Sequence, residues 1–212
     1  KVTPIPLRNR PNILLAVASD WSWPHAGAYG NRVIKTPAFD SVAEGGVLFA
    51  NAFVATPDYG PSRLSILTGR YPWAMKDGRN CEGETVSTFP ELLAKEGYFT
   101  GCQGEGWSID GEGYADRKLA GDRYTNFPKF LDARPAHTPF CYCLSADNTR
   151  RPYEAGAGEA AGIDPSKIRV PGFLPADDAV RSDMADYFDA IQRFDSTLQS
   201  ALRSLAKAGQ LN

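Results

Sequence analysis

Ser19 and Asp20 are the first residues in this chain whose types and position suggest chemistry. They follow a near-continuous apolar run over residues 12–18, which predicts a parallel strand covered on both faces. Ligands of parallel sheets bind beyond the carboxyl ends of the strands, so a site is expected here. The Asp20 carboxylate could take part in such a site, or it could cap a turn or a helix.

Tyr59 and Arg63 form a second pair, four residues apart at the start of a helix predicted over residues 61–68. A phenol has a pKa of about 10, so a tyrosine nucleophile needs activation. The alternative is an aromatic side chain that fills a pocket. Arg63 could hold an anion, or it could form an ion pair at the start of the helix with Asp58 or Asp20.

The bulk composition limits the function classes. A chain of 212 residues can bury one sizeable core, and its formal charge of -2 argues against a nucleic-acid binder. No apolar run approaches the roughly 20 residues that cross a bilayer, so no transmembrane segment is expected. The start has no signal-peptide character, so an export signal is absent or already removed.

Four cysteines are spaced in a way that does not indicate a metal site. With two histidines in the whole chain, a structural zinc site is not expected. Buried free thiols are favoured over disulfides. The cysteines are Cys81, Cys102, Cys141 and Cys143.

Alternating strand and helix patterns predict an α/β domain with a mostly parallel sheet. The longest periodic segment, residues 179–209, has apolar residues at three- and four-residue spacing and predicts an amphipathic helix. Residues 108–121 and 151–175 are expected to be mostly loop. The predicted strands are 12–18, 47–54, 98–103 and 140–145, and the other predicted helices are 37–46, 61–68 and 88–97.

Residues 59–70 read Y-G-P-S-R-L-S-I-L-T-G-R, which resembles the sulfatase signature C-x-P-S-R-x-x-x-L-T-G-R with Tyr59 at the cysteine position. Residues 10–21 resemble the amino-terminal R-P-N-I-L-x-x-x-A-D-D of the same family. Further matches are the Y-G of 29–30, the T-P-x-x-D of 36–40, the lead-in at 51–54, and residues 168–174 and 181–193.

The chain therefore resembles the amino-terminal part of sulfatases of the alkaline phosphatase superfamily, nearest the bacterial sulfamidase-like sulfatases. This resemblance implies a three-layer α/β sandwich with a mostly parallel sheet, truncated before the carboxyl-terminal part. It also implies one sulfatase-like domain over residues 1–212. Because the family is often exported, an extracytoplasmic location, periplasmic or secreted, is expected.

The resemblance also implies a chemistry against which single residues can be compared. In the family the signature cysteine becomes formylglycine, whose hydrate attacks sulfur, while a calcium ion held by carboxylates polarises the sulfate. Lys and His side chains neutralise charge and protonate the leaving group.

Four positions that match this active site are substituted. Ser19 replaces one of two metal-binding aspartates and leaves Asp20, and Tyr59 replaces the nucleophile. Glu105 stands where the sulfate-binding lysine is usual. Arg150 stands where an active-site histidine is usual, with a one-residue slip of the alignment left open. Arg63 is retained, so the pattern indicates a pseudoenzyme that kept its fold.

Asn212 lies before the point where sulfatases continue into T-x-D-[NH]-G, which supplies further metal ligands. The chain is expected to be a fragment, or to have lost the rest. A truncated sheet needs covering, which predicts a protein partner. An anionic glycan held by Arg63 and Arg150 is a second expected partner. No cofactor is expected, except calcium if the site at Ser19 and Asp20 still binds it.

Two function hypotheses follow. The first is a sulfatase-like pseudoenzyme that acts as a structural or binding subunit through protein–protein contact. The second is a divergent, metal-dependent hydrolase of sulfuric or phosphoric esters that uses Tyr59 or a nearby hydroxyl such as Ser62. A third reading is a fragment whose missing half decides the function.

Overall fold

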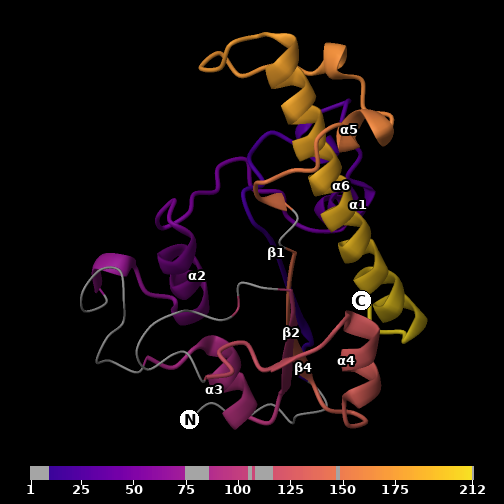
Figure 1. The fold of residues 1–212 in the computed structure, drawn as a ribbon. Helices are drawn as coiled ribbons and strands as arrows, with labels where there is room; N and C mark the ends of the chain where they lie inside the picture. Colours follow the sequence, from indigo (N-terminus) through magenta and orange to yellow (C-terminus); the bar gives the residue numbers. More distant parts are fainter. Residues whose placement is uncertain (1–9, 75–85, 105–106, 108–116, 147–148, 212) are drawn as a thin grey trace. The chain divides into compact units, whose positions relative to one another are not determined.

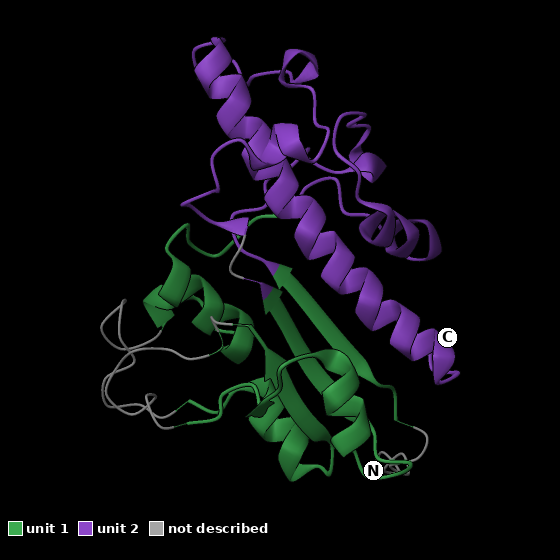
Figure 2. Ribbon diagram, turned by 45° about the vertical axis from the view of Figure 1, so that its right-hand side comes forward, with its two compact units in different colours: residues 1–17, 52–145 green, residues 18–51, 146–212 purple. Residues whose placement is uncertain are grey.

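The computed structural model describes residues 10–74, 86–104, 107, 117–146 and 149–211 (Figure 1). The chain divides into two compact units, each formed from two stretches of sequence (Figure 2). Unit 1 comprises residues 1–17 and 52–145, and unit 2 comprises residues 18–51 and 146–212. The prediction of a single family domain over residues 1–212 stays a prediction.

Strands and helices are interspersed along the described chain, as in an α/β fold. In chain order they are β1 (Ile13–Ala18), η2 (Gly27–Tyr29), α1 (Pro37–Gly45), α2 (Tyr59–Thr68), η3 (Pro72–Ala74), α3 (Phe89–Lys95), β2 (Phe99–Gln103), β3 (Asp122–Arg123), α4 (Phe127–Ala133), β4 (Phe140–Ala146), α5 (Ala157–Ala160), η5 (Pro165–Lys167) and α6 (Asp178–Lys207).

The sheet of unit 1 has helices on both faces. Its strand order is β1-β4-β2-β3, and β2 pairs in parallel with both β4 and β3. Successive side chains of β4 point to opposite faces. Cys141 and Cys143 pack with residues of α2 and α3, while Phe140 and Tyr142 meet Phe127 and Phe130 of α4. The three layers of unit 1 follow from this alternation.

Local sequence signals begin and end the helices of unit 1. The Thr88 side chain accepts the amide of Glu91, and the Glu91 carboxylate accepts the amide of Thr88, which makes a capping box at α3. The Asn126 side chain accepts the amide of Lys129 at the start of α4. Gly69 ends α2 in the left-handed conformation, with a φ of 68°.

Unit 2 is organised around α6, the 30-residue helix at the end of the chain. Its apolar side buries Met184, Phe188 and Ile191 with residues of neighbouring loops. Two carboxylates on the same helix serve as caps for other elements. Asp195 accepts the amides of Ala38 and Phe39 at the start of α1, at 2.9 and 2.8 Å, and Asp186 accepts two amides at α5.

Most of the predicted elements are confirmed. The apolar runs at 12–18, 98–103 and 140–145 form β1, β2 and β4, and the periodic segment 179–209 forms α6. The helices predicted at 37–46, 61–68 and 88–97 are α1, α2 and α3, although α2 starts two residues early, at Tyr59. Residues 151–175 hold only α5 and η5 besides loop.

Two predictions about elements were wrong or incomplete. Residues 47–54 form no strand, and their side chains are largely exposed, because no neighbouring strand pairs with them in the described chain. The α4 helix was not predicted, since only Phe127 and Phe130 give it an apolar side. Part of the loop predicted at 108–121 lies outside the described residues.

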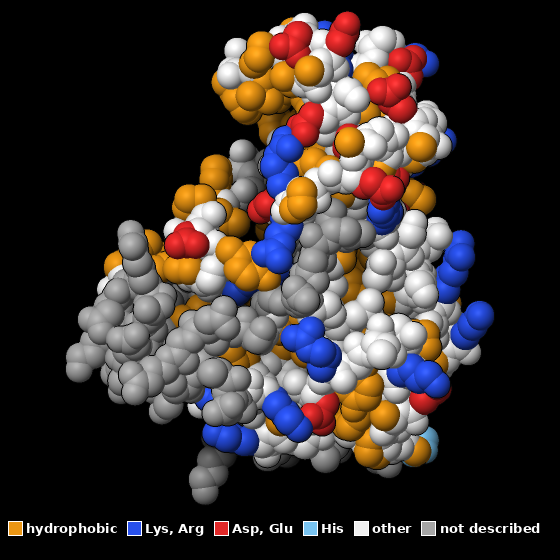
Figure 3. Space-filling model, in the orientation of Figure 1, with side chains coloured by type: hydrophobic (Ala, Val, Ile, Leu, Met, Phe, Trp, Pro, Cys, Tyr) orange, Lys and Arg blue, Asp and Glu red, His pale blue; other side chains and the backbone are white. Residues whose placement is uncertain are grey.

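The three described cysteines, Cys102, Cys141 and Cys143, are buried free thiols as predicted, and Cys81 lies outside the described residues. None of the helices in the described part of the chain combines the length and apolar character that crossing a bilayer requires. On the face drawn in Figure 3, the described Lys and Arg side chains stand among acidic, apolar and uncharged ones. No single sign of charge dominates that face.

Candidate functional site

The helix that carries the signature begins at the residue expected to do the chemistry. Tyr59 is the first residue of α2, and Asp58 precedes it as the N-cap. The Tyr59 side chain is 37% exposed, so its phenol stands at the surface of unit 1 rather than in its core. A group at this end of a helix experiences the positive end of the helix dipole.

Arg63 lies one turn further along the same helix and is buried, with 4% of its surface exposed. Its guanidinium carbon is 5.4 Å from the centroid of the Tyr59 ring and 4.7 Å from that of Trp107. Both distances fall within the range of cation–π attraction. Arg63 therefore contacts the aromatic ring that stands in the position of the family's nucleophile.

Ser19 and Asp20 lie where the sequence predicted, directly after β1. Ser19 is buried and Asp20 is exposed. The backbone of Asp20 has a φ of 56°, which is the left-handed region that aspartate adopts more readily than most residues. Such a turn directs the Asp20 carboxylate out of the strand.

Asp20 lines a cavity of about 520 Å³ that lies within unit 2. Aromatic side chains form much of its wall, and the charged residues Arg151 and Asp183 also line it. The negative charge of Asp20 lies close enough to raise the pKa of Tyr153, whose largest cause of elevation is burial. The cavity thus combines an apolar wall with a carboxylate at a strand end, as small-molecule sites often do.

A hydrogen-bonded pair, His25 and Tyr187, stands in the same cavity. The hydroxyl of Tyr187 accepts the Ser22 amide at 2.9 Å and lies 3.2 Å from Nδ1 of His25. Burial raises the pKa of Tyr187 to about 12 and lowers the pKa of His25. His25 and Tyr187 therefore share a hydrogen bond, and the Tyr187 hydroxyl also accepts from the Ser22 amide.

Arg151, and not Arg150, is the arginine that lines this cavity. Its guanidinium makes a two-pronged ion pair with the Asp183 carboxylate, with Nη1 2.7 Å from Oδ1, and lies 5.0 Å from the centroid of the Tyr153 ring. Arg150 itself is exposed. If the alignment with the family is shifted by one residue, Arg151 rather than Arg150 occupies the position of the family's histidine.

The described residues at this strand end do not make up a calcium site by themselves. Calcium takes six to eight oxygen ligands, several of them carboxylates. Among the described residues, no three His, Cys, Asp or Glu side chains gather closely enough to hold an ion. Asp183, the other carboxylate that lines the cavity, is paired with Arg151. Calcium binding at Ser19 and Asp20 stays a prediction.

The predicted site residues fall into two groups that belong to different units. Tyr59 and Arg63 lie together in unit 1, while Ser19, Asp20 and Arg150 belong to unit 2. Glu105 lies outside the described residues, so the predicted charge reversal there stays a prediction.

Sequence reasoning missed His25, Tyr187 and Asp183, which line the cavity beside Asp20. His25 offered a weak signal, because it is one of two histidines and follows a predicted strand end by a few residues. The sequence around Tyr187 and Asp183 gave no sign of a functional site; it indicated only that both residues belong to a helix. Their contact with residues 20–25 depends on the packing of segments more than 150 positions apart.

Comparison with known proteins identifies relatives. The family profile described as "Sulfatase" matches residues 11–155. The chain is 28% identical to the N-sulphoglucosamine sulphohydrolase of Homo sapiens, over 97% of this chain and 49% of that protein. It is 36% identical to the ulvan-active sulfatase of Formosa agariphila, over 42% of this chain and 19% of that protein.

Among solved structures, the phosphonate monoester hydrolase of Agrobacterium radiobacter superposes with a TM-score of 0.66 at 16% identity, over 95% of this chain and 60% of that one. The fold is thus the α/β fold of alkaline-phosphatase-like enzymes. The chain spans about half the length, or less, of the two curated sulfatases it matches. Since the family profile covers more than half of the chain, this protein belongs to the sulfatase family.

Proposed function

We propose that this chain is a catalytically silent sulfatase-family domain that acts by binding rather than by turnover. The observation that carries the proposal is Tyr59 at the first position of α2, with its ring against the buried Arg63. A phenol has no thiol from which formylglycine could form. A neutral phenol is also a weak nucleophile unless a neighbouring base activates it.

The charged residues of unit 2 support the same proposal. The arginine that lines the cavity, Arg151, is held by Asp183 and cannot donate a proton near neutral pH. Arg150, at the aligned position, has the same limitation. Neither side chain replaces a histidine as the acid that protonates a leaving group.

The binding partner in this proposal is another protein chain. Unit 1 exposes several large apolar side chains near α2, among them Phe53, at 91%, and Trp73, at 72%. Phe53 and Tyr71 line one pocket beside α2, and the Tyr71 ring stacks on Trp73. An exposed apolar surface of this kind is typical of an interaction site. We also propose an extracytoplasmic location, which rests on the resemblance to exported sulfatases; fractionation of the source cells tests it.

The rival function is a divergent, metal-dependent hydrolase of sulfuric or phosphoric esters. The observation in its favour is the cavity beside Asp20, where the pair His25 and Tyr187 could hold and move a proton. The curated relatives are named as sulfatases. An assay of ester hydrolysis is therefore needed to distinguish a catalytic role from a binding role.

The test measures hydrolysis of an aryl sulfate and an aryl phosphate by the full natural protein, with and without added calcium. We expect no turnover above that of a Tyr59→Phe variant, because the phenol does no chemistry. A second arm uses Tyr59→Cys, produced together with a formylglycine-generating enzyme. This variant is expected to stay inactive, because other positions are substituted as well.

Turnover by the unmodified protein that disappears in Tyr59→Phe would overturn the proposal in favour of a tyrosine nucleophile. Turnover that needs calcium and survives in Tyr59→Phe would overturn it in favour of the cavity at Asp20. Circular dichroism of each variant separates a lost activity from a lost fold.

A further inference from the structure

We infer that residues 47–54 bind the same segment of a second copy of this chain, as two antiparallel strands related by a two-fold axis at Asn51. The segment reads V-L-F-A-N-A-F-V and connects α1 to α2. The chain passes from unit 2 to unit 1 within it. All residues from 44 to 54 are exposed, so the apolar side chains of this segment face solvent.

The backbone of the segment is open to pairing as well. Within the described part of the chain, no amide of residues 47–55 donates a hydrogen bond, and only the carbonyl of Phe49 accepts one. The segment holds no charge, proline or glycine, and such segments readily pair with another strand when their backbone groups are open. The chain bends at residues 50 and 51, so pairing would straighten it there.

The order of the residues favours a second copy over an unrelated chain. On each side of Asn51 stand an alanine, then a phenylalanine, then a branched aliphatic residue. These mirror pairs are Ala50 and Ala52, Phe49 and Phe53, and Leu48 and Val54. In an antiparallel pair centred on Asn51, each residue lies opposite its mirror position. Like side chains therefore meet along the whole segment, and cross-strand pairs of aromatic residues stabilise a sheet.

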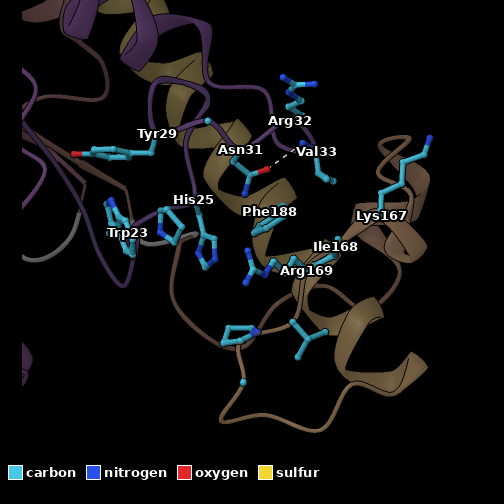
Figure 4. A pocket seen from close by; sticks show the side chains of 15 residues that line it. Trp23, His25, Tyr29, Asn31, Arg32, Val33, Lys167, Ile168, Arg169 and Phe188 are labelled. Atoms are coloured by element: carbon cyan, nitrogen blue, oxygen red, sulfur yellow. Dashed lines mark hydrogen bonds between the residues drawn. The ribbon is translucent and has the colours of Figure 1, made fainter.

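The contact of Tyr29 determines which edge of the strand is open. Its hydroxyl donates to the Phe49 carbonyl at 2.9 Å, and in Figure 4 it points away from Asn31 and Phe188, which line the same cavity of about 760 Å³. Successive residues of a strand direct their backbone groups to opposite edges. Because Tyr29 covers the edge of Phe49, the second copy pairs through the edge of Ala50. Phe49 then belongs to a non-hydrogen-bonded pair, in which the opposing Cα atoms are closest, at about 4.5 Å.

Asn51 fixes the register of the pair. An asparagine side chain carries both donors and an acceptor, so the two copies of Asn51 can hydrogen-bond to each other across the axis. A slip of one residue would place Asn51 opposite an alanine and would leave its amide without that partner. It would also separate the phenylalanine pairs, so the sequence favours one register.

Apolar side chains of unit 1 enlarge the contact. Phe53 and Val54 line a cavity of about 310 Å³ together with Ile66 and Tyr71, beside α2. In the paired arrangement, Phe49 of the partner subunit lies opposite Phe53, at the edge of this cavity. Two strands alone are marginally stable in water, so burial of this neighbouring apolar area is needed to hold the pair.

A second copy is one specific choice of the protein partner proposed above, so this step rests on that part of the proposed function. It does not depend on the loss of catalysis at Tyr59, which the assay of ester hydrolysis tests by itself. A protein that fails to pair with itself would leave the result of that assay unchanged, so the two proposals fail separately.

Analytical ultracentrifugation of the full natural protein over a range of concentrations tests the inference. We expect the average mass to rise from one chain toward two and no further, because Tyr29 covers the other edge of the strand. The variants Asn51→Asp and Asn51→Lys each place two like charges on the axis. Each is expected to raise the dissociation constant of the pair by about tenfold or more at low salt, since like charges directly opposite are unfavourable.

An equimolar mixture of Asn51→Asp and Asn51→Lys is expected to pair again, because opposite charges then face each other across the axis. The matched controls are Ser200→Asp and Ser200→Lys, which introduce the same charges at an exposed residue of α6. Alone and mixed, the controls should pair as the unmodified protein does. Circular dichroism of each variant checks that the fold is kept.

A protein that stays monomeric at every concentration would overturn the inference, and another partner or segment would then cover residues 47–54. Pairing that both Asn51 variants leave unchanged would also overturn it. So would a mixture that pairs no more tightly than either variant alone, or growth of the assembly beyond two chains.

Discussion

Arg63 is a cation that the fold keeps almost entirely out of water. Its guanidinium contacts the rings of both Tyr59 and Trp107, so the retained arginine of the signature has a structural role whatever its chemistry. Buried charges are tolerated where other groups offset the lost hydration, and two aromatic faces contribute to that here.

We predict that Arg63→Ala destabilises unit 1 by about 2–4 kcal/mol, because it leaves a cavity and removes both ring contacts. The control is Lys129→Ala, an exposed cation of α4 in the same unit, which should change stability by no more than about 0.5 kcal/mol. Urea unfolding followed by circular dichroism measures both. Equal stability of the two variants would contradict the structural role.

His25 makes the stability of unit 2 depend on pH. Burial lowers its folded pKa below the ordinary value of 6.5, so protonation favours the unfolded chain. The contribution to stability is therefore complete above pH 6.5 and is lost as the pH falls through the folded pKa.

We predict that the free energy of unfolding falls as the pH is lowered from neutral through 6.5 toward the depressed folded pKa of His25, and that His25→Gln reduces this fall. The control is His137→Gln, which changes the other, exposed histidine of the chain. Denaturant titrations across this pH range provide the measurement. An unchanged pH profile in His25→Gln would mean that other groups cause the fall.

At the scale of elements, α5 packs so closely against α6 that Gly158 of α5 has no room for a side chain. A Cβ placed on Gly158 would lie 2.2 Å from the Ala185 carbonyl carbon and 2.3 Å from its oxygen. Both are backbone atoms, which cannot swing aside. The Gly158 amide also donates to Asp186 of α6, at 2.9 Å.

We predict that Gly158→Ala destabilises unit 2 by about 1–3 kcal/mol, as overpacking against backbone does. Gly45→Ala is the matched control, because nothing lies within 4 Å of its Cβ position in α1. Alanine there should be neutral or stabilising by up to about 1 kcal/mol, through its higher helix propensity. Thermal melts distinguish the two, and a neutral Gly158→Ala would contradict the close packing.

Helices and strands with many apolar residues were predictable, and short ones were not. Six consecutive apolar residues in β1 and a repeating apolar face over α6 identify those elements without any tertiary information. The seven residues of α4 carry only two buried side chains. Residues 47–54 have strand-like composition, yet a strand forms only where a partner strand supplies hydrogen bonds.

At the scale of the whole molecule, unit 1 exposes apolar side chains near α2 that an isolated domain would be expected to cover. Phe53 and Val54, which precede α2, are exposed, as are Tyr71 and Trp73, which follow it. The rings of Tyr71 and Trp73 stack at 4.3 Å, so they form one flat apolar surface. This surface is where the proposed protein partner would dock.

We predict that Phe53→Ser/Trp73→Ser lowers the binding of an apolar fluorescent dye without changing the free energy of unfolding, because both side chains are exposed already. Val42→Ser, a change at an exposed residue of α1, is the control and should alter dye binding little. Dye emission and urea titrations give the two readouts. A large loss of stability in the double variant would show that these side chains pack internally.

The sequence by itself determined the family and the main strands and helices, and it placed Tyr59 and Arg63 about one helical turn apart. Each of these depends on residues close together in the chain, whose spacing translates directly into a helix turn or a strand face. The tertiary structure alone decided that Arg151 rather than Arg150 lines the cavity beside Asp20, and that residues of the segments 23–33 and 167–172 line another. Cavities form between segments distant in sequence, and no local pattern encodes which side chains will meet there, because packing of the whole core decides it.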